Sequence, residues 1–431
     1  MPLSVGKNES GKWLRLFGCW LLLLACFFPA ADVQAASADD IRPPELSSAG
    51  AILMDGSTGQ VLYEKQADQR FYPASITKIL TAIVAMENGQ LDDVVTVSEE
   101  AVRADGTRVY LVAGEQKTLR ELLYAMMVNS GNDAAVAIAE HIAGSVENFA
   151  VMMNQKAADL GAVNSHFVNP SGLHEDNHYT TARDMAVIAQ YAMRNPLFRQ
   201  IVETKTMPWN GDEWQSQLVN HNKLLWQYEG ATGVKNGYTS KAKQTFVATA
   251  KKGDIELVAV CLQAPSQAAM YNDLKALLDY GFNAFAAEPV VSQSDRFYPP
   301  HGTDVALRTN GNLHILRPIN GEDGKSPAIS TQVVMEDMEY PISKGQQVGQ
   351  LHIALDGRTV IQATLYAAEA VVPPAYAEQT TNKAAGVAAS SLWLVVSLAT
   401  LAWIGFTYFQ RTRFARRVKL PVSLDRRNTI Q

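Results

Sequence analysis

The sequence predicts an α/β protein in which an antiparallel sheet is flanked by helices and carries a helical subdomain, followed by a small all-β sandwich domain and a C-terminal transmembrane helix. Three observations predict this order. Strand patterns stand at both ends of residues 36–285 with helical periodicity between them, as when helices are inserted into one sheet. Residues 286–371 form short alternating runs separated by Asn-Gly, Lys-Gly and Asp-Gly pairs, which is typical of hairpins. Residues 387–409 carry no charge and are long enough to cross a bilayer core of about 30 Å.

The N-terminal segment has the pattern of a secretory signal. An apolar run, residues 16–31, follows a short basic region, and the residues up to Ala35 are small enough for a cleavage site. The basic residues are Lys7, Lys12 and Arg15. We therefore expect residues 1–35 to be a signal peptide that is removed after Ala35. Lipid attachment at Cys26, in the sequence Leu-Leu-Ala-Cys, is the alternative.

The flanks of the apolar run 387–409 favour a membrane span over its alternative, a buried core helix. Seven basic residues and one acidic residue follow in the tail 410–431, and such clusters remain on the cytoplasmic side of a membrane. The segment 372–386 is polar and contains Pro and Gly, so we expect a flexible linker there. The folded part of the chain should then lie outside the membrane, held by its C-terminal end.

Charge and cysteine content exclude several classes of function. Residues 36–410 carry 27 basic and 40 acidic side chains, a net charge of −13, which excludes nucleic acid as a partner. Cys261 is the single cysteine after the signal, and its apolar neighbours predict a buried thiol without a disulfide. We find no spacing of His, Cys, Asp or Glu typical of metal ligands, so we expect neither a metal nor a cofactor.

The elements of residues 36–285 follow from local patterns. A hairpin is expected at 50–64 around the turn 56–59, and apolar residues at helical spacing predict a helix from about 76 to 88. Thr118 and Glu121 form a capping-box pattern before the apolar run 122–128. The remaining expected elements are helices from 133, at 149–160 and at 181–194, strands within 230–239, 244–250 and 255–264, and a helix at 271–285.

Ser75 and Lys78 are the first candidate reactive pair. Residues three apart share a helix face, and a serine near a helix start lies at the positive end of the helix dipole. A neutral Lys78 could take the proton of Ser75, provided that burial or a nearby cation lowers the pKa of its amine. The alternative is that Ser75 is an ordinary helix N-cap.

Two further motifs change this balance. Ser130-Gly131-Asn132 lies between two apolar helices, where it is either a helix stop with a cap or a group that relays a proton and holds an amide. Lys235-Asn236-Gly237 lies in a strand pattern, where a cation can lower the pKa of Lys78 and glycine allows a substrate backbone to approach closely.

The ordered set of motifs resembles the signature of penicillin-binding proteins and serine β-lactamases. Longer segments, among them YPASITKILTA, FVNPSGLHEDNHYTTARDMA, NHNKLLW and GVKNGYTS, resemble the D-alanyl-D-alanine carboxypeptidases, the low-molecular-weight penicillin-binding proteins. The resemblance covers residues 50–285, and residues 286–371 are similar to the C-terminal domain that these enzymes often carry. It implies a β-lactamase/DD-peptidase-like catalytic domain outside a bacterial cell membrane, with the chain spanning that membrane once. It also implies a role in peptidoglycan biosynthesis and cell shape.

The resemblance implies a role for each candidate residue. Ser75 is acylated by the stem peptide and the terminal D-alanine leaves, Lys78 is the general base, and Ser130 passes a proton to the leaving amine. The backbone N–H groups of Ser75 and Tyr238 form the oxyanion hole. The implied substrate-binding residues are Asn132, Lys235, Asn236, Gly237 and Tyr238. β-Lactam antibiotics would acylate the same serine.

The chain departs from the family pattern at three positions. It has Asn236 where threonine is usual, Lys243 where glycine is usual, and Met270 where many members have an arginine. That threonine and arginine help to hold the carboxylate of the substrate, so we hypothesise that Lys243 partly replaces the missing cation. These departures also leave two alternatives open, a catalytically weak penicillin-binding protein of the cell wall and a β-lactamase. A Ser-His-Asp hydrolase is disfavoured because Gly-x-Ser-x-Gly is absent.

Overall fold

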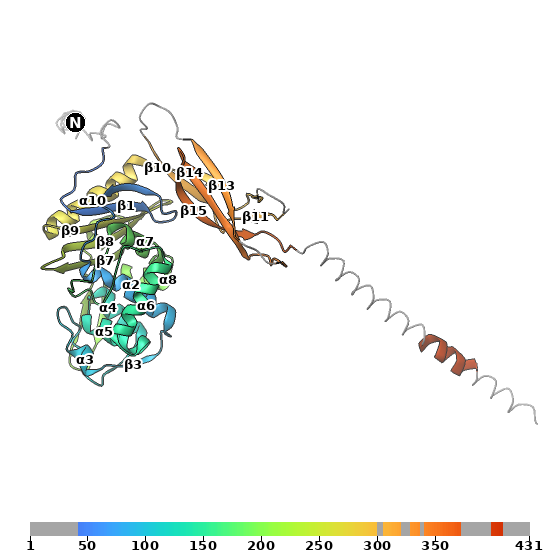
Figure 1. Cartoon of the computed structure of the whole chain (residues 1–431). Coiled ribbons are helices and arrows are strands. Elements are labelled where there is room, and N and C mark those ends of the chain that lie inside the picture. The colour runs from blue at the N-terminus through green and yellow to red at the C-terminus, as the bar shows by residue number, and fades with distance from the viewer. Residues whose placement is uncertain (1–41, 300–304, 320–327, 337–339, 372–397, 408–431) are drawn as a thin grey trace, which may run out of the picture. The chain divides into compact units, whose positions relative to one another are not determined.

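The computed structural model describes residues 42–299, 305–319, 328–336, 340–371 and 398–407. Within them the chain divides into two compact units (Figure 1). The first runs to Glu288 and takes in the return segment from Leu316, and the second runs from Pro289 to Ile315 and continues from Pro327. The boundary falls inside two paired strands, β10 (Phe285–Val291) and β12 (Leu313–Pro318).

The first unit is built on one antiparallel sheet with the strand order β2-β1-β9-β8-β7. The N-terminal hairpin thus joins strands from the end of the unit, as the sequence predicts, because Leu53 of β1 pairs with Ala259 of β9. The bounds are β1 (Gly50–Asp55), β2 (Val61–Lys65), β7 (Ala231–Thr239), β8 (Lys243–Lys252) and β9 (Ile255–Ala264).

Both faces of this sheet are buried, and the period of two along each strand divides the side chains between two cores. Along β8, Phe246 and Ala248 belong to the core that packs against α10 (Gln267–Ala284). Val247, between them, belongs to the larger core on the opposite face, with the helix α7 (Ala182–Ala192) (Figure 1). The predicted burial of Cys261 is confirmed, since its thiol is fully enclosed.

The helical subdomain forms where the sequence predicts it, with shifts at several ends. The capping box is present: the Thr118 side chain accepts from the Glu121 amide, and the Glu121 carboxylate accepts from the Thr118 amide. The helix expected at 149–160 begins three residues earlier, because Ser145 caps it. The subdomain helices are α2 (Lys78–Asn88), α4 (Leu119–Val128), α5 (Asn132–Ala143), α6 (Val146–Asp159) and α8 (Pro196–Glu203).

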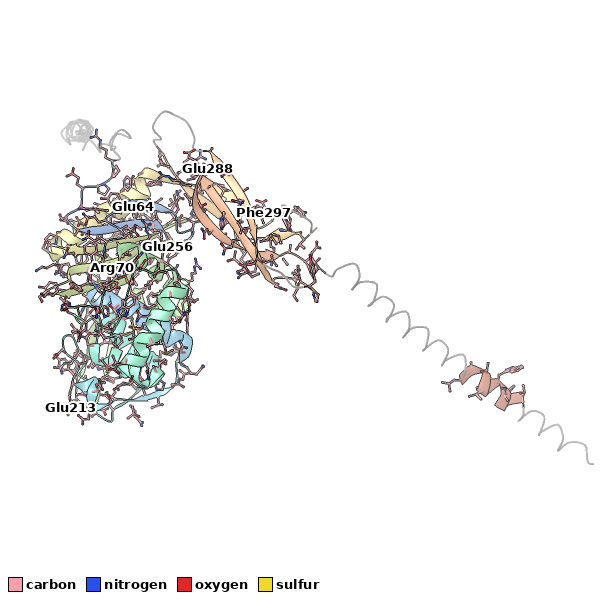
Figure 2. The ribbon with its side chains drawn as sticks, viewed as in Figure 1. Glu64, Arg70, Glu213, Glu256, Glu288 and Phe297 are labelled. Carbon is pink, nitrogen blue, oxygen red and sulfur yellow. The ribbon has the colours of Figure 1, made fainter. Side chains whose placement is uncertain are left out.

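Several short elements have no counterpart in the sequence prediction. They are β3 (Val94–Thr96), α3 (Glu99–Val102), β4 (Gln116–Thr118), β5 (Thr206–Asn210), β6 (Gln215–Val219) and α9 (Leu224–Gln227). The helix α8 was also missed, although Asn195 caps it and Pro196 opens it. Arg199 of α8 pairs with Glu256 of β9 at 2.6 Å, which joins this helix to the sheet. Figure 2 labels Glu256 among the side chains of the first unit.

The described residues of the second unit up to 371 are all-β, as the sequence predicts. Its main sheet has the order β11-β15-β14-β13 and its own apolar core, which includes Leu351, Ile353 and Leu365. The bounds of these strands are β11 (Leu307–Arg308), β13 (Ile329–Met335), β14 (Gln347–Leu355) and β15 (Arg358–Ala367).

The predicted membrane and targeting segments fall largely outside the described residues. Of the expected span 387–409, residues 398–407 are described and are helical. Within the described ranges, no helix combines the length and apolar character needed to cross a bilayer. The signal 1–35, the linker 372–386 and the tail 410–431 lie outside the described residues.

Candidate active site

Ser75 lies where the chain enters the first long helix. It is the second residue of a 3₁₀ turn, η2 (Ala74–Thr77), which continues directly into α2. Ala74 has a φ of 53°, and the carbonyl of Pro73 accepts a hydrogen bond from Thr245 Oγ1 of β8 at 2.7 Å. No side chain caps either helix, so the N-cap alternative for Ser75 is wrong.

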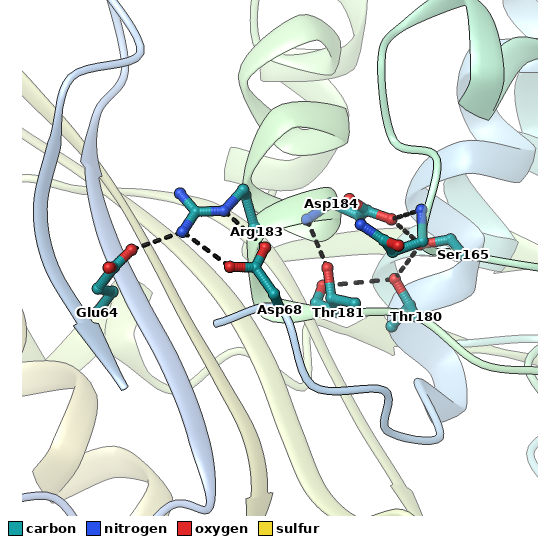
Figure 3. Close-up of polar contacts among 8 residues, drawn as sticks. Glu64, Asp68, Ser165, Thr180, Thr181, Arg183 and Asp184 are labelled. Atoms are coloured by element: carbon teal, nitrogen blue, oxygen red, sulfur yellow. Dashed lines mark hydrogen bonds and ion pairs between the residues drawn. The ribbon is translucent and has the colours of Figure 1, made fainter. Parts of the chain in front are cut away.

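Ion pairs anchor the segment that leads to this turn. Arg183 of α7 donates to Asp68 at 2.8 Å and to Glu64 of β2 at 2.5 Å (Figure 3). The hydrogen bond from Arg183 lowers the pKa of the Asp68 carboxyl. Next to Arg183, Asp184 accepts from Ser165 Oγ at 2.7 Å. Partly exposed pairs contribute little stability each, but together they hold α7 against the chain that carries Ser75.

Lys78 is fully buried and its amine contacts three oxygens. Lys78 Nζ lies 3.1 Å from Ser75 Oγ, 2.6 Å from Asn132 Oδ1 and 2.6 Å from the carbonyl oxygen of Ser171. These partners come from three segments that are far apart in the sequence. The structure therefore brings Ser75, Lys78 and Asn132 together, as the sequence predicts.

The surroundings of Lys78 favour its neutral form. Burial is the largest cause that lowers the pKa of its amine well below 10.5, and the charge of Lys235 is the next. The carboxylate of Asp133 acts in the opposite direction. A neutral amine has two N–H bonds and one lone pair. Two carbonyl oxygens and one hydroxyl around it match this inventory.

The break between α4 and α5 carries the second motif. Ser130 has a φ of 65° and is buried, while Asn132 is the first residue of α5. Asn132 Nδ2 donates to the carbonyl of Asp105 at 2.5 Å, so both ends of its amide are engaged. Asn132 is thus not a helix cap. In the described part of the chain, the Ser130 hydroxyl has no hydrogen bond to the other predicted site residues.

The third motif lies on β7, an edge strand of the sheet. Lys235 is buried, and burial lowers the pKa of its amine to about 7. Its Nζ donates to the carbonyl of Asn236 at 2.9 Å. A Cβ placed on Gly237 would stand 2.6 Å from the amide nitrogen of Ser75, so glycine is required for this approach. The side chain of Tyr238 is exposed.

The sequence prediction missed two groups that position Lys78. Asn169 Oδ1 accepts from the amides of Ser171 and Gly172, and this turn aims the Ser171 carbonyl at the lysine. The turn residues Asn-Pro-Ser-Gly could have indicated a tight loop. A backbone carbonyl as a partner for Lys78 has no signature in a sequence.

Two buried titratable groups behind the site hold its backbone. Asp133 accepts from the amides of Val109, at 3.0 Å, and Leu111, at 3.1 Å, and burial raises the pKa of its carboxyl. His178 Nδ1 accepts from the Val168 amide, so its Nε2–H donates to Thr77 Oγ1 at 2.9 Å. Burial is the first cause that lowers the pKa of His178 to about 3, and its imidazole is therefore neutral.

Comparison with known proteins identifies the family. A family model described as D-alanyl-D-alanine carboxypeptidase matches residues 35–266, which is more than half of the chain and contains every residue of the three motifs. The chain belongs to the D-alanyl-D-alanine carboxypeptidase family. A second model, the C-terminal domain of penicillin-binding protein 5, matches residues 303–373.

Individual D-alanyl-D-alanine carboxypeptidases agree with this assignment. The enzyme DacF of Bacillus subtilis is 34% identical over 363 residues, covering 81% of this chain and 92% of DacF. The enzyme DacA of Escherichia coli is 31% identical and covers 80% of this chain and 90% of DacA. The crystal structure of penicillin-binding protein 5 from Haemophilus influenzae has a TM-score of 0.63 at 29% identity, covering 77% of this chain and 99% of that protein.

Within the described residues, no group of three or more His, Cys, Asp and Glu side chains is arranged to hold a metal ion.

Proposed function

We propose that this D-alanyl-D-alanine carboxypeptidase uses Ser75 as its nucleophile and Lys78 as its general base. One observation carries the proposal: the buried amine of Lys78 has Ser75 Oγ at 3.1 Å and carbonyl oxygens of Asn132 and Ser171 at 2.6 Å. When the amine is neutral, its two N–H bonds are donated to the carbonyl oxygens. Its lone pair then faces the Ser75 hydroxyl and accepts its proton.

The acylation step follows from this arrangement. Ser75 Oγ attacks the carbonyl carbon between the two D-alanines of the stem peptide, and its proton passes to Lys78 Nζ. The negative charge on the carbonyl oxygen is received by the backbone N–H groups of Ser75 and Tyr238, which contribute roughly 3–4 kcal/mol per donor in such hydrolases. The close approach of Gly237 to the Ser75 amide supports this pairing.

Ser130 completes the proton path. The leaving amine of D-alanine needs a proton, and Ser130 donates its own while it is resupplied by the protonated Lys78. The C–N bond then breaks and D-alanine departs. A water molecule then attacks the ester carbonyl of the acyl-enzyme. The bond to Ser75 Oγ breaks, Ser75 regains its proton, and the shortened peptide is released. A β-lactam acylates Ser75 by the same attack, and its amine remains tethered.

Substrate binding is assigned to five residues. We propose that Asn132 donates to the substrate amide, that Lys235 supplies positive charge, and that Asn236, Gly237 and Tyr238 line the strand along which the peptide lies. The pKa of Lys235, about 7, leaves part of its population charged at neutral pH.

We further propose that the catalytic domain works on the outer side of the bacterial cell membrane, as a single-pass protein. The predicted signal 1–35, the apolar run 387–409 and its basic tail support this location. A carboxypeptidase in that place acts on peptidoglycan during its biosynthesis and thereby on cell shape.

The test is release of D-alanine from a diacylated tripeptide ending in D-Ala-D-Ala. Wild-type protein should release D-alanine, Ser75→Ala should not, and mass spectrometry after penicillin labelling should find the adduct on Ser75. A stable adduct without D-alanine release would indicate a catalytically weak penicillin-binding protein. Turnover of the penicilloyl adduct within seconds would indicate a β-lactamase. An adduct on another residue would contradict the proposal.

A further inference from the structure

A cavity of about 490 Å³ adjoins the catalytic strand β7. It is walled by β7 on one side and by the loop before α9 and the start of α10 on the other. Its lining residues are Val219, Asn220, His221, Lys223, Trp226, Asn236 and Gln267. Asn236 is the link to the site, because its neighbour Gly237 lies against Ser75.

Lys223 carries the fixed positive charge of this cavity. Of the lining residues, none is acidic, and Lys223 is the one lysine. Its Nζ contacts the neutral Gln267 Oε1 at 3.4 Å, a long hydrogen bond. No carboxylate of the described residues forms an ion pair with it. The Lys223 side chain is also exposed, so an anion can reach its ammonium group.

Hydrogen bonds fix the backbone of the loop that bears Lys223. The hydroxyl of Tyr271 in α10 accepts from the Lys223 amide at 3.1 Å and donates to the His221 carbonyl at 3.2 Å. Asn222 is buried and accepts from the Leu224 amide at 2.9 Å. These bonds fix the backbone from which Lys223 extends, and Lys223 lines the same cavity as Asn236.

The cavity also lies within the field of the catalytic lysines. Desolvation, followed by the charges of Lys235 and Lys78, lowers the pKa of the His221 imidazole to about 4. His221 is thus neutral at pH 7, and the cavity is positive through Lys223 and the charged fraction of Lys235. The start of α10, an 18-residue helix with Gln267 as its first residue, adds the positive end of its dipole.

We propose that Lys223 binds the free carboxylate of the C-terminal D-alanine and so makes the enzyme specific for peptides with a free C-terminus. This proposal rests on the proposed function. The carboxylate lies one residue beyond the carbonyl that Ser75 attacks, about 3.8 Å along the chain. Asn236 is likewise one residue from Gly237, about 3.3 Å along β7. A peptide that lies along β7 with its C-terminus toward Asn236 places its carboxylate at the cavity that Lys223 lines.

The two positions named from the sequence do not line this cavity. Met270 is fully buried within α10. Lys243 is exposed and pairs with Thr239 at the end of the β7–β8 hairpin, three residues beyond Asn236 along β7. The hypothesis that Lys243 replaces the missing cation is untested, so Lys243→Gln is the competing variant. Lys241, an exposed lysine in the turn between β7 and β8, is the matched control.

The experiment compares two diacylated tripeptides, one ending in D-Ala-D-Ala with a free carboxylate and one with a C-terminal amide. Product formation is followed by mass spectrometry with the full-length protein in detergent. We expect Lys223→Gln to lower kcat/KM for the acid roughly tenfold, as for the loss of a solvent-exposed charge-assisted hydrogen bond. The change should lie mainly in KM, and kcat/KM for the amide should stay within about twofold of wild type.

Two further measurements keep the result decisive. Lys223→Arg should retain the preference for the acid, and Lys241→Gln should leave this preference unchanged. In wild-type protein the acid-to-amide ratio should fall as salt is raised, because the charge is exposed, whereas Lys223→Gln should lack this salt dependence. An unchanged ratio in Lys223→Gln, or an equal loss in Lys243→Gln, would overturn the inference. A wild-type protein that cleaves neither peptide would instead overturn the proposed function.

Discussion

Gly237 of β7 lies so close to Ser75 that a Cβ on it would stand 2.6 Å from the Ser75 amide nitrogen. The same hypothetical Cβ would be 2.7 Å from Thr245 Oγ1, which holds the Pro73 carbonyl just before the nucleophile. The position of the strand and the position of the nucleophile thus depend on each other, and the absence of a side chain at 237 is part of the site.

Gly237→Ala should therefore impair acylation. The added methyl group must displace β7 or the Ser75 amide, which moves one donor of the proposed oxyanion hole. We expect the rate of penicillin acylation to fall by roughly 10²–10³-fold, the effect of losing one such donor. The melting temperature serves as the folding control. An acylation rate close to wild type would show that the donor does not depend on this contact.

Replacing Lys78 by methionine should separate catalysis from stability. The methionine keeps much of the volume but has no lone pair for the Ser75 proton, so we expect penicillin acylation to fall by between about 10² and 10⁴-fold. Methionine removes the desolvation cost of a buried amine but leaves the carbonyl oxygens of Asn132 and Ser171 without their donor, so the free energy of unfolding should fall by no more than about 3 kcal/mol. Urea denaturation measures the second effect. A large loss of stability with retained acylation would contradict both expectations.

The titration of Lys235 should limit activity at high pH. Burial lowers the pKa of its amine to about 7, so the group is charged below pH 7 and becomes neutral above it. A peptide with a free carboxylate then loses an attraction, and its KM should rise between about pH 7 and 9. In Lys235→Arg the guanidinium stays charged throughout, and this rise should disappear. A KM that rises equally in both proteins would assign the titration to another group.

Asp133 should affect the pH at which the rate of penicillin acylation falls on the acid side. Its carboxylate raises the pKa of the Lys78 amine against the stronger effects of burial and Lys235. Asp133→Asn removes this charge and retains an oxygen for the Val109 and Leu111 amides. The amine of Lys78 should then lose its proton at lower pH, and the acid limb of penicillin acylation should shift to lower pH with the rate at pH 8 preserved. A limb that moves to higher pH would contradict this role for Asp133.

Caps and apolar patterns in the sequence predicted the helices and strands whose formation depends on residues close together in the chain. Thr118 and Glu121 form their reciprocal cap within one helical turn, and Thr181 caps α7 by accepting from the Asp184 amide at 3.0 Å. The strands β8 and β9 were predictable because each has a central run of apolar and β-branched residues, 245–250 and 257–262, flanked by polar residues. The helix α8 was missed because it is short and sits between other patterns.

The residues of the candidate site likewise fall into those that the sequence could name and those that it could not. The reactive types Ser75, Lys78, Ser130 and Lys235 could be named from their spacing and from the resemblance to a family. Ser171 could not be named, since its contribution is a backbone carbonyl placed by a turn around Asn169. Lys223 was also missed, because a lone lysine before a short helix has no pattern that separates it from a surface residue.

The sequence by itself determined which elements form and which reactive groups the chain carries, because periodicity, caps and turns act over a few neighbouring residues. Only the tertiary structure decided that Lys78 is fully buried, surrounded by three oxygens and close to a second lysine. Desolvation and Coulomb interactions depend on segments distant in the sequence, and the pKa that makes Lys78 a base exists only after those segments have packed together.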